Sequence, residues 1–357
     1  MIRYDRPAKL TALQAISEAQ KLAFAPIAFQ ASIALLRLGV LKAVAATGDR
    51  GARAAEIAET LSLREYGVRV LLDMGLSAGL VWLREDRYVL DKVGDFLLND
   101  EMTRINTSFV ADVCYDAMSR LQESVKEGLP RGLERLGNWP TLYPGLTSLA
   151  EPARTSWFRF DHFYSMHACD AALDHLFATR PRHILDIGGN VGIWALACAR
   201  RDAAVRVTIV DLPEQILAAR RNIEGSEVAS RIDYCPMDVL DPHGTLPAGA
   251  DTIWMSQFLD CFSEEQSLGI LRRAAATLGS SGSIFVLELL CDRQQHEAAA
   301  YSLNATSLYF TCIANGVSRM YRSDDLLRLI DAAGLRVEAQ HDNLGIGHTL
   351  LRCVKRG

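Results

Sequence analysis

The feature that most constrains the fold is a series of short apolar runs that begins near residue 182. The runs are rich in β-branched residues and read "HILDIG", "RVTIVDL", "RIDYCPMD", "TIWMSQFL" and "SIFVLELL". Helical stretches separate the first two runs, separate the fourth from the fifth, and follow the last. This alternation predicts an α/β domain whose parallel sheet is covered by helices on both faces. The closing runs "RVEAQHDN" and "HTLLRCVK" predict an antiparallel pair of strands.

The first hundred residues have a helical pattern instead. Segment 24–46, "FAPIAFQASIALLRLGVLKAVAA", is apolar on most sides, which indicates burial in a core or against a second copy of the chain. Two helices interrupted at Ser62 come next, followed by a hairpin that turns at Glu85-Asp86, and this order is the pattern of a winged helix. We therefore predict a helical and winged-helix domain over 1–110, a helical connector and lid over 111–175, and the sheet domain over 176–357.

The connector contains an aromatic-rich stretch, "TSWFRFDHFYSMH", at residues 155–167. A core helix would explain this composition. A helix that closes over a bound ligand would explain it equally well, and the sequence leaves both interpretations open.

The charge balance and the apolar runs limit the class of protein. The 357 residues carry 38 Lys and Arg against 43 Asp and Glu, a net charge of −5. This acidic balance argues against nucleic-acid binding, which needs clustered positive charge. No uninterrupted apolar run reaches about 18 residues, and the N-terminus lacks the apolar core of a signal peptide. We therefore expect a cytoplasmic protein that does not bind membranes.

The spacing of cysteine and histidine bears on metal binding and redox state. The eight cysteines form no CxxC pair, and several lie in apolar runs. The eight histidines show no HxxxH or HExxH spacing. We therefore expect reduced thiols and no metal ion.

A glycine turn follows the first strand of the sheet domain, in "ILDIGGNVGIWALACA" (184–199). Gly188 and Gly189 permit a positive φ and a close approach of the backbone to a ligand. The helix that starts near Val191 can present free N–H groups to a carboxylate or phosphate. The turn departs from GxGxxG, which favours a nucleoside without a diphosphate, and S-adenosylmethionine fits that description.

Acidic residues lie at the ends of three successive predicted strands: Asp186, Asp211 and Asp238. An acid at the end of the second strand holds ribose hydroxyls, which is the role expected of Asp211. Asp238 can accept a hydrogen bond from an adenine amino group. Each acid alone could be a turn residue or a helix cap, but together they predict an adenosine pocket.

In these segments the chain resembles the small-molecule O-methyltransferases of the caffeic-acid type and their bacterial relatives. The resemblance covers nearly the whole chain. Its N-terminal part rests on "LLRLGVLKAV", "AAEIAETLSL", "VRVLLDMGLSAGLV" and "RYVLDKVGDFLL", and the rest on "LDIGGNVG", "VDLPEQI", "PMDVL", "MSQFLDCFSEEQ" and "NGVSRMYRSDDLLRLIDAAGL". It implies a class I methyltransferase fold, with a Rossmann-like seven-stranded sheet behind a winged-helix domain that forms a homodimer.

The resemblance also implies a cofactor and a small-molecule acceptor. The cofactor is S-adenosylmethionine, which leaves as S-adenosylhomocysteine. Met166 and nearby aromatic residues would border the acceptor pocket. Tyr164, Tyr301, Asn304 and Tyr309 could also line it, although helical packing explains them about as well. The residues expected to bind the cofactor are Asp186, Gly188, Gly189, Asp211, Leu212, Asp238, Val239 and Ser256.

The catalytic positions depart from the family pattern. Asp260, in "LDCF", stands where the family usually has the histidine that acts as general base. Glu288, in "VLELL", matches the carboxylate that orients that base. Ser318, in "GVSRMY", stands where a second carboxylate is usual. One of the three catalytic positions is therefore kept.

Three functions remain open on these residues. The first is methyl transfer to a hydroxyl or ring carbon of a phenolic acceptor, with Asp260 and Glu288 as base and orienting partner. The second is other chemistry on the same cofactor, such as hydroxylation, decarboxylation or rearrangement. The third is a winged-helix binding protein with a ligand-sensing domain, which the acidic charge disfavours.

The base is the weak point of the first function. A solvated aspartate has a pKa of about 3.9 against about 10 for a phenol, so Asp260 needs burial beside Glu288 to raise its pKa. His162, His167 and His348 are alternative bases, although a lone histidine is more often structural.

Overall fold

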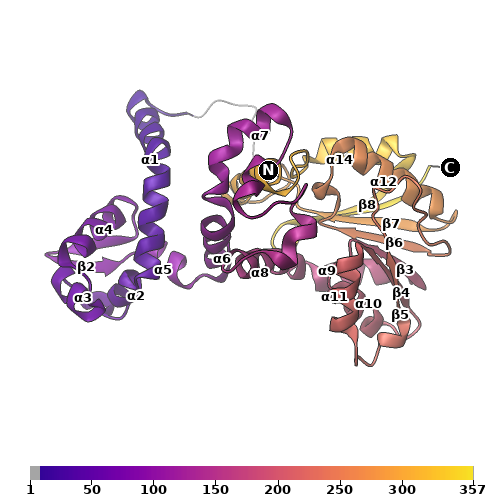
Figure 1. Cartoon of the computed structure of the whole chain (residues 1–357), viewed down its shortest axis with the longest axis horizontal. Coiled ribbons are helices and arrows are strands. Elements are labelled where there is room, and N and C mark those ends of the chain that lie inside the picture. The colour runs from indigo at the N-terminus through magenta and orange to yellow at the C-terminus, as the bar shows by residue number, and fades with distance from the viewer. Residues whose placement is uncertain (1–8, 357) are drawn as a thin grey trace. The chain divides into compact units, whose positions relative to one another are not determined.

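The computed structural model describes residues 9–356 and divides them into two compact units, one ending at Val113 and the other beginning at Cys114 (Figure 1). The second unit contains residues of the predicted connector together with the whole sheet.

The first unit has the predicted order of helices followed by a hairpin. Ser62, in a left-handed conformation at φ 54°, separates its third and fourth helices. The hairpin strands pair antiparallel around Glu85-Asp86. Its elements are α1 (Ala12–Arg37), α2 (Val40–Ala45), α3 (Ala54–Leu61), α4 (Glu65–Ser77), β1 (Val81–Arg84), β2 (Arg87–Leu90), α5 (Lys92–Asn99) and α6 (Glu101–Phe109).

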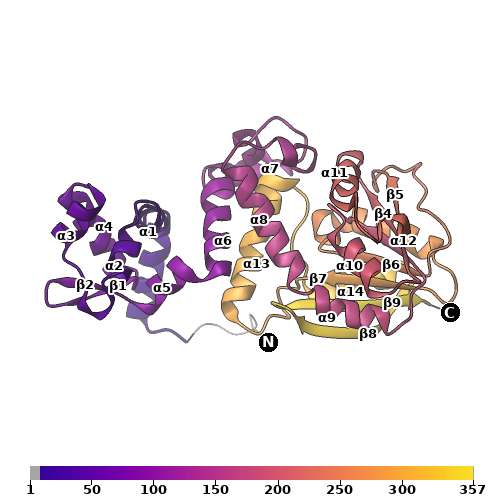
Figure 2. The ribbon, with the colours of Figure 1, turned by 90° about the horizontal axis from the view of Figure 1, so that it is seen from below.

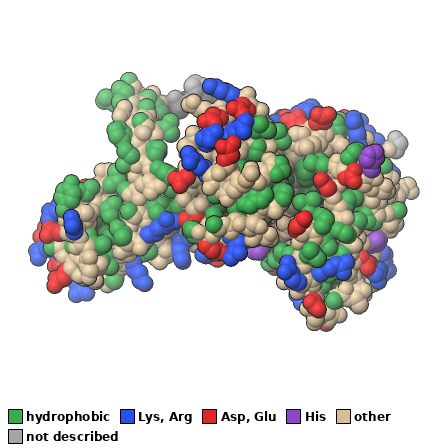
Figure 3. Space-filling model, in the orientation of Figure 1, with side chains coloured by type: hydrophobic (Ala, Val, Ile, Leu, Met, Phe, Trp, Pro, Cys, Tyr) green, Lys and Arg blue, Asp and Glu red, His purple; other side chains and the backbone are tan. Residues whose placement is uncertain are grey.

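Helix α1 exposes much of its apolar surface. Its N-terminus is closed by a capping box between Thr11 and Gln14. Leu13 and Leu22 are 80% and 73% exposed, and Figure 3 shows hydrophobic side chains along this helix. By length and composition α1 could cross a membrane. The sequence shows no uninterrupted apolar run of this length, because polar residues such as Gln14 and Glu18 interrupt it without breaking the helix.

The second unit contains the predicted sheet, in the order β5-β4-β3-β6-β7-β9-β8. The first five strands of this order are parallel, and β9 is antiparallel to both β7 and β8, which confirms the predicted sheet with its antiparallel pair. The strands are β3 (His183–Ile187), β4 (Arg206–Asp211), β5 (Ile232–Pro236), β6 (Thr252–Ser256), β7 (Ser283–Glu288), β8 (Leu335–Leu344) and β9 (His348–Lys355).

Helices cover both faces of this sheet. Figure 1 shows α12 and α14 on one side of the strands and α10 and α11 on the other. The helices of this unit are α7 (Leu121–Glu127), α8 (Ala153–Met166), α9 (Cys169–Phe177), α10 (Ile193–Arg201), α11 (Pro213–Ile223), α12 (Glu264–Thr277), α13 (Glu297–Tyr309) and α14 (Ser323–Ala332).

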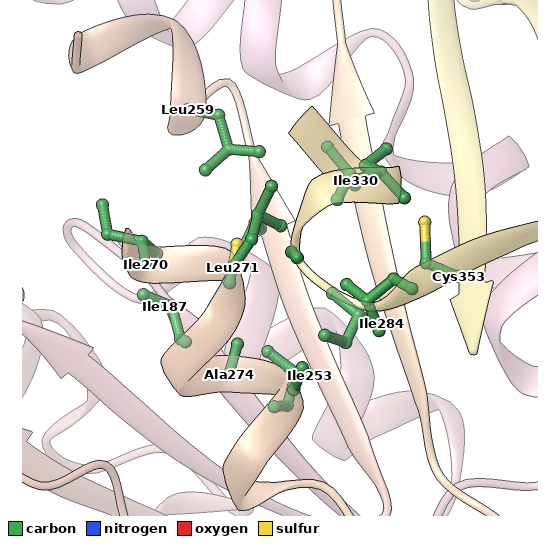
Figure 4. Packing of buried hydrophobic residues seen from close by; sticks show 14 of the residues in the cluster. Ile187, Ile253, Leu259, Ile270, Leu271, Ala274, Ile284, Ile330 and Cys353 are labelled. Carbon is green, nitrogen blue, oxygen red and sulfur yellow. The ribbon is translucent and has the colours of Figure 1, made fainter. Parts of the chain in front are cut away.

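The two faces divide the core by the alternation of strand residues. Ile253 and Ile284 pack against Leu271 of α12 and Ile330 of α14 (Figure 4). On the opposite face, the core beneath α9, α10 and α11 is built on the neighbouring strand residues, such as Trp254. Because β3 to β7 are parallel, their carboxyl ends meet at one edge of the sheet. Strand β3 has β4 on one side and β6 on the other, so the strand order reverses at β3. Sheets of this kind bind their ligands at the point where the strand order reverses.

Candidate active site

The glycine turn at the end of β3 leaves no room for side chains. Gly188 has φ +79°, and a Cβ placed there would lie 2.3 Å from the ring of Phe258. A Cβ on Gly189 would lie 2.7 Å from Oδ2 of Asp186. Both positions therefore require glycine, and the bare backbone of the turn forms a cradle before α10.

Asp186 lies beneath this cradle and is buried. Its Oδ2 has no hydrogen-bond partner among the described residues. Burial, together with the charge of Asp211, raises the pKa of Asp186 to about 8. A buried acceptor without a partner is unusual and suits a polar ligand group.

Asp211, at the end of β4, ties the turn to the neighbouring strand. Its Oδ2 accepts a hydrogen bond from the backbone amide of Asn190 at 2.8 Å, and its Oδ1 accepts one from Leu212 at 2.7 Å. Burial raises the pKa of Asp211. Each carboxylate oxygen can accept a further hydrogen bond, so the expected contact with ribose hydroxyls is compatible with this arrangement.

The remaining predicted cofactor residues lie at the same edge of the sheet. Asp238 follows β5 and is exposed, and its Oδ1 accepts a hydrogen bond from the amide of Leu240 at 2.8 Å, which is the geometry of a turn. Val239 beside it is buried. Ser256 is half-buried at the end of β6.

Asp260 lies in a single 3-10 turn, Leu259–Cys261, directly after β6. It is 4% exposed. Burial raises its pKa, the thiol of Cys261 at 3.5 Å lowers it, and the charge of Asp161 raises it further. The hydroxyl of Ser267 in α12 donates to the carbonyl of Leu259 at 3.1 Å and fixes the turn.

Glu288 ends the adjacent strand β7 and is 1% exposed. Its Oε1 accepts hydrogen bonds from the backbone amides of Phe258 at 3.1 Å and Leu259 at 2.9 Å. Burial and the charge of Asp260 raise its pKa well above the usual range. Its Oε2 has no partner within the described part of the chain. Glu288 thus holds the backbone that carries Asp260, and the two carboxyl groups lie in one buried cluster.

Asp161 belongs to this cluster and was missed by the sequence prediction. It lies on α8, and its Oδ2 accepts a hydrogen bond from Nδ2 of Asn190 at 3.3 Å. Burial raises its pKa, although the neighbouring His162 lowers it. The available signal was that Asp161 is the only acid in the aromatic-rich helix.

A second missed feature is Asn315, which follows α13. Its Nδ2 donates to the carbonyl of Cys261 at 2.8 Å, to the hydroxyl of Ser318 at 2.8 Å, and to the hydroxyl of Tyr143 at 3.1 Å. The buried Ser318 therefore joins a neutral hydrogen-bond network at the place where the family usually has a carboxylate. Tyr143 brings a phenol to the same cluster.

The residues predicted to bind the acceptor differ in how deeply they are buried. Tyr309 is buried, and its hydroxyl accepts a hydrogen bond from Nε1 of Trp157 at 2.7 Å, which joins α13 to α8 (Figure 2). Burial raises the pKa of Tyr309, with contributions from Cys261 and Asp161 among others. Tyr164 is half-buried, whereas Met166 and Asn304 are exposed.

The alternative bases differ in their surroundings. His162 is half-buried, and its Nε2 has no partner among the described residues. His167 is exposed, and its Nδ1 lies 2.6 Å from the carbonyl of Phe163. His348 is fully buried, and burial lowers its pKa to about 4.

This geometry defines a class of protein. The sheet order, the glycine cradle where the strand order reverses and the buried acids beside it are those of a class I S-adenosylmethionine-dependent methyltransferase. Comparison with known proteins gives the family. Residues 17–88 match the model of the Dimerisation2-like domain, and residues 166–336 match that of the O-methyltransferase domain. The chain resembles the small-molecule O-methyltransferases in both matched domains, and the resemblance seen in the sequence is confirmed.

Two curated relatives match most of the chain. It is 27% identical over 290 residues to 3-hydroxy-5-methyl-1-naphthoate 3-O-methyltransferase of Streptomyces sahachiroi, covering 77% of this chain and 78% of the relative. It is 22% identical over 262 residues to L-tyrosine C(3)-methyltransferase of Streptomyces lavendulae, covering 72% and 70%.

A solved structure confirms the fold. The O-methyltransferase NcsB1 from neocarzinostatin biosynthesis, in complex with S-adenosylmethionine and 2-hydroxy-5-methyl naphthoic acid, superposes with a TM-score of 0.69 at 22% identity, covering 98% of this chain and 100% of that one.

The N-terminal match also bears on α1. Most of this helix lies within the matched dimerisation domain, so its exposed apolar surface is that of a dimerisation domain and does not indicate a membrane protein. The second matched domain covers the parallel strands from β3 to β7.

The cofactor of the family fits the residues present. The cradle at Gly188 and Gly189 admits close backbone contact, and Asp186 offers an acceptor without a partner. The protein is therefore an enzyme that uses S-adenosylmethionine and yields S-adenosylhomocysteine.

Proposed function

We propose that this enzyme transfers a methyl group to a small aromatic acceptor, at a hydroxyl or a ring carbon, with Asp260 as the proton acceptor. The observation that carries the proposal is the burial of Asp260 on a turn whose backbone is held by Glu288. The cofactor supplies an electrophilic methyl group on a sulfonium. The chain's own residues then have to orient the acceptor and remove its proton.

Burial improves Asp260 as a base. A solvated aspartate is mismatched to a phenol by roughly six pKa units. Burial and the charge of Asp161 raise the pKa of Asp260 and narrow that gap. General-base catalysis contributes typically about 10²–10⁴-fold, so alignment of the acceptor by the surrounding groups supplies much of the remaining rate.

The cofactor and the acceptor use different parts of the site in this proposal. The acceptor would lie against Tyr309 and Tyr164, with Met166 and Asn304 at its outer margin. The cofactor would be held by the strand-end and turn residues Asp186, Gly188, Gly189, Asp211, Leu212, Asp238, Val239 and Ser256.

The relatives support an aromatic acceptor without fixing the atom that is methylated. One acts on a hydroxynaphthoate oxygen and the other on a ring carbon of tyrosine. Both are methyltransferases, as is the matched domain, and this favours methyl transfer over hydroxylation, decarboxylation or rearrangement. An ortho carbon of a phenol becomes nucleophilic when its hydroxyl is hydrogen-bonded to a carboxylate, so Asp260 serves either outcome.

We further propose that the enzyme is a cytoplasmic homodimer that binds neither nucleic acid nor membranes. The dimerisation domain and its exposed apolar helix support the dimer. The net charge of −5 opposes nucleic-acid binding. Light scattering, a gel shift with random duplex DNA and vesicle sedimentation test these three points in turn.

The activity is tested with methyl-labelled S-adenosylmethionine and a panel of hydroxynaphthoates, other phenols and tyrosine. Label transferred to an acceptor is the expected result, and NMR of the product distinguishes oxygen from carbon methylation. A cofactor that binds while the panel yields only unlabelled, oxidised or decarboxylated products would replace methyl transfer with the second chemistry.

A further inference from the structure

Two carboxyl groups from different parts of the chain, one buried and one half-buried, lie near the glycine turn. Asp260 comes from the turn after β6, and Asp161 comes from α8. Asp161 is close enough for its charge to raise the pKa of Asp260, and it also accepts the hydrogen bond from Asn190 of the glycine turn. Asp161 is therefore a neighbour of both the glycine turn and the proposed proton acceptor.

No lysine or arginine of the described chain forms an ion pair with either carboxyl group. The ionisable groups that face Asp161 are His162 and Tyr309. Those around Asp260 are Cys261, Tyr143, Tyr321 and Glu288. Buried charges are ordinarily paired. An uncompensated pair of acids thus fits a ligand that brings its own positive charge.

Glu288 is not the group that meets such a charge. Burial and the charge of Asp260 raise its pKa well above the usual range. Its Oε1 is already engaged with two backbone amides. Asp161 and Asp260, whose pKa values burial raises to about 6 and about 7, are the acids left to respond to that charge.

We propose that Asp161 and Asp260 act as one titrating pair whose charge follows that of the methyl donor. The pair is ionised when the cationic sulfonium is bound, and it holds one more proton when the neutral thioether product is bound. This inference rests on the proposed function. It adds Asp161 as a positioning residue that acts through Asp260.

The pair keeps the charge of the buried site constant during the reaction. The acceptor oxygen forms its bond to the methyl carbon as the carbon–sulfur bond breaks, and that electron pair stays on sulfur. The acceptor proton passes to Asp260. One positive charge on sulfur and one negative charge on the pair disappear together, so no net charge is left uncompensated in a region of low dielectric.

S-adenosylmethionine and S-adenosylhomocysteine make a matched pair of probes, because they differ only in the methyl group and its charge. A cation favours the ionised carboxyl groups, so binding of the first ligand releases protons that the second does not. Isothermal titration of both ligands in buffers of different ionisation enthalpy counts these protons. The affinity of S-adenosylmethionine relative to that of S-adenosylhomocysteine should also rise with pH, by up to about tenfold per pH unit if the two ligands differ by one released proton.

Variants locate the effect. Asp161→Asn keeps an oxygen for the Asn190 hydrogen bond but removes the charge, and it should lose most of the difference in proton release while S-adenosylhomocysteine still binds. Asp170→Asn is the matched control, since this exposed acid lies on the next helix, α9, and should leave the difference intact.

Equal proton release on binding of the two ligands to the wild-type protein would overturn the proposal that Asp161 and Asp260 titrate as a pair. This measurement uses only the wild-type protein, so it does not depend on the folding of a variant. A full difference retained in Asp161→Asn would overturn the role of Asp161. If neither ligand bound, the cofactor assignment itself would fail, which is a distinct result from equal proton release by two bound ligands.

Discussion

The carboxyl group of Glu288 accepts a hydrogen bond from the backbone amide of Leu259 at 2.9 Å. This contact joins the end of β7 to the turn that follows the neighbouring strand β6. The direction of Asp260 is therefore set through the backbone, and Glu288 need not touch the acceptor to matter. The kept acid of the family pattern has a structural task in this chain that is separate from its charge.

We expect Glu288→Gln and Glu288→Ala to differ sharply. The glutamine oxygen can still accept both amide hydrogen bonds, so its free energy of unfolding should stay within about 1 kcal/mol of wild type. Alanine leaves two buried amides unpaired and a cavity, which should cost about 2–5 kcal/mol. Urea unfolding at pH 7 measures both. Equal destabilisation by the two variants would show that the charge, and not the accepted hydrogen bonds, is what matters.

Asp260→Asn should reduce turnover by about 10²–10⁴-fold, the typical contribution of a general base. Affinity for the uncharged S-adenosylhomocysteine should change by less than about threefold, because the predicted cofactor contacts lie elsewhere. Cys261→Ser is the neighbouring control, since a hydroxyl can still donate to Asp260. Unchanged turnover in the asparagine variant would remove the role assigned to Asp260.

The neutral network around Asn315 should control the acceptor and not the cofactor. Asn315→Ala removes the contacts to the Cys261 carbonyl, the Ser318 hydroxyl and the Tyr143 hydroxyl. We expect KM for the acceptor to rise about tenfold, the value of one or two hydrogen bonds. Ser318→Ala removes one of these contacts and should have a smaller effect. Steady-state kinetics at saturating cofactor separate the two variants, and an effect on cofactor affinity alone would contradict this assignment.

Gly188→Ala should disrupt the cradle. Its φ of +79° and a Cβ contact of 2.3 Å with Phe258 both oppose a side chain. Gly225 has the same φ but open space around its Cβ position, so Gly225→Ala carries only the backbone cost of about 1–3 kcal/mol. A larger loss of stability and of cofactor affinity is expected for Gly188→Ala, measured by thermal unfolding and titration. Similar losses in the two variants would mean that the contact with Phe258 relaxes freely.

The sheet was predictable because its signals are local. Each strand is predicted by a short run of β-branched residues, and the turn residues follow directly in the sequence. The positions of Gly188, Asp211 and Glu288 at one edge then follow from parallel strands alone. Asp260 was recognisable for the same reason, since it comes directly after the apolar run of β6.

The acceptor side of the site was less predictable because it is assembled over long separations. Asp161 reaches Asn190 from a helix whose aromatic residues suit a core equally well. Asn315 is hydrogen-bonded to both Tyr143 and Cys261, and no sequence pattern in any of the three segments predicts these hydrogen bonds. Met166 and Asn304 are exposed, and helical spacing alone does not predict the exposure of a residue.

His348 should make the folded protein less stable as the pH falls. Burial lowers its pKa to about 4, whereas an unfolded histidine has a pKa of about 6.5. Below pH 6.5 the unfolded state therefore binds a proton that the folded state does not bind. The resulting loss in the free energy of unfolding grows to about 3 kcal/mol near pH 4. Asp186, with a pKa of about 8, acts in the opposite direction, because its folded state holds a proton that the unfolded state releases.

The contribution of His348 is isolated by comparing His348→Leu with wild type at each pH, because Asp186 is present in both. Urea unfolding at pH 7.5 and 4.5 should show that the variant gains stability relative to wild type as the pH falls. Asp186→Asn should show the reverse trend, gaining most at high pH. A difference between His348→Leu and wild type that does not change with pH would mean that the ring has the same pKa in the folded and unfolded protein.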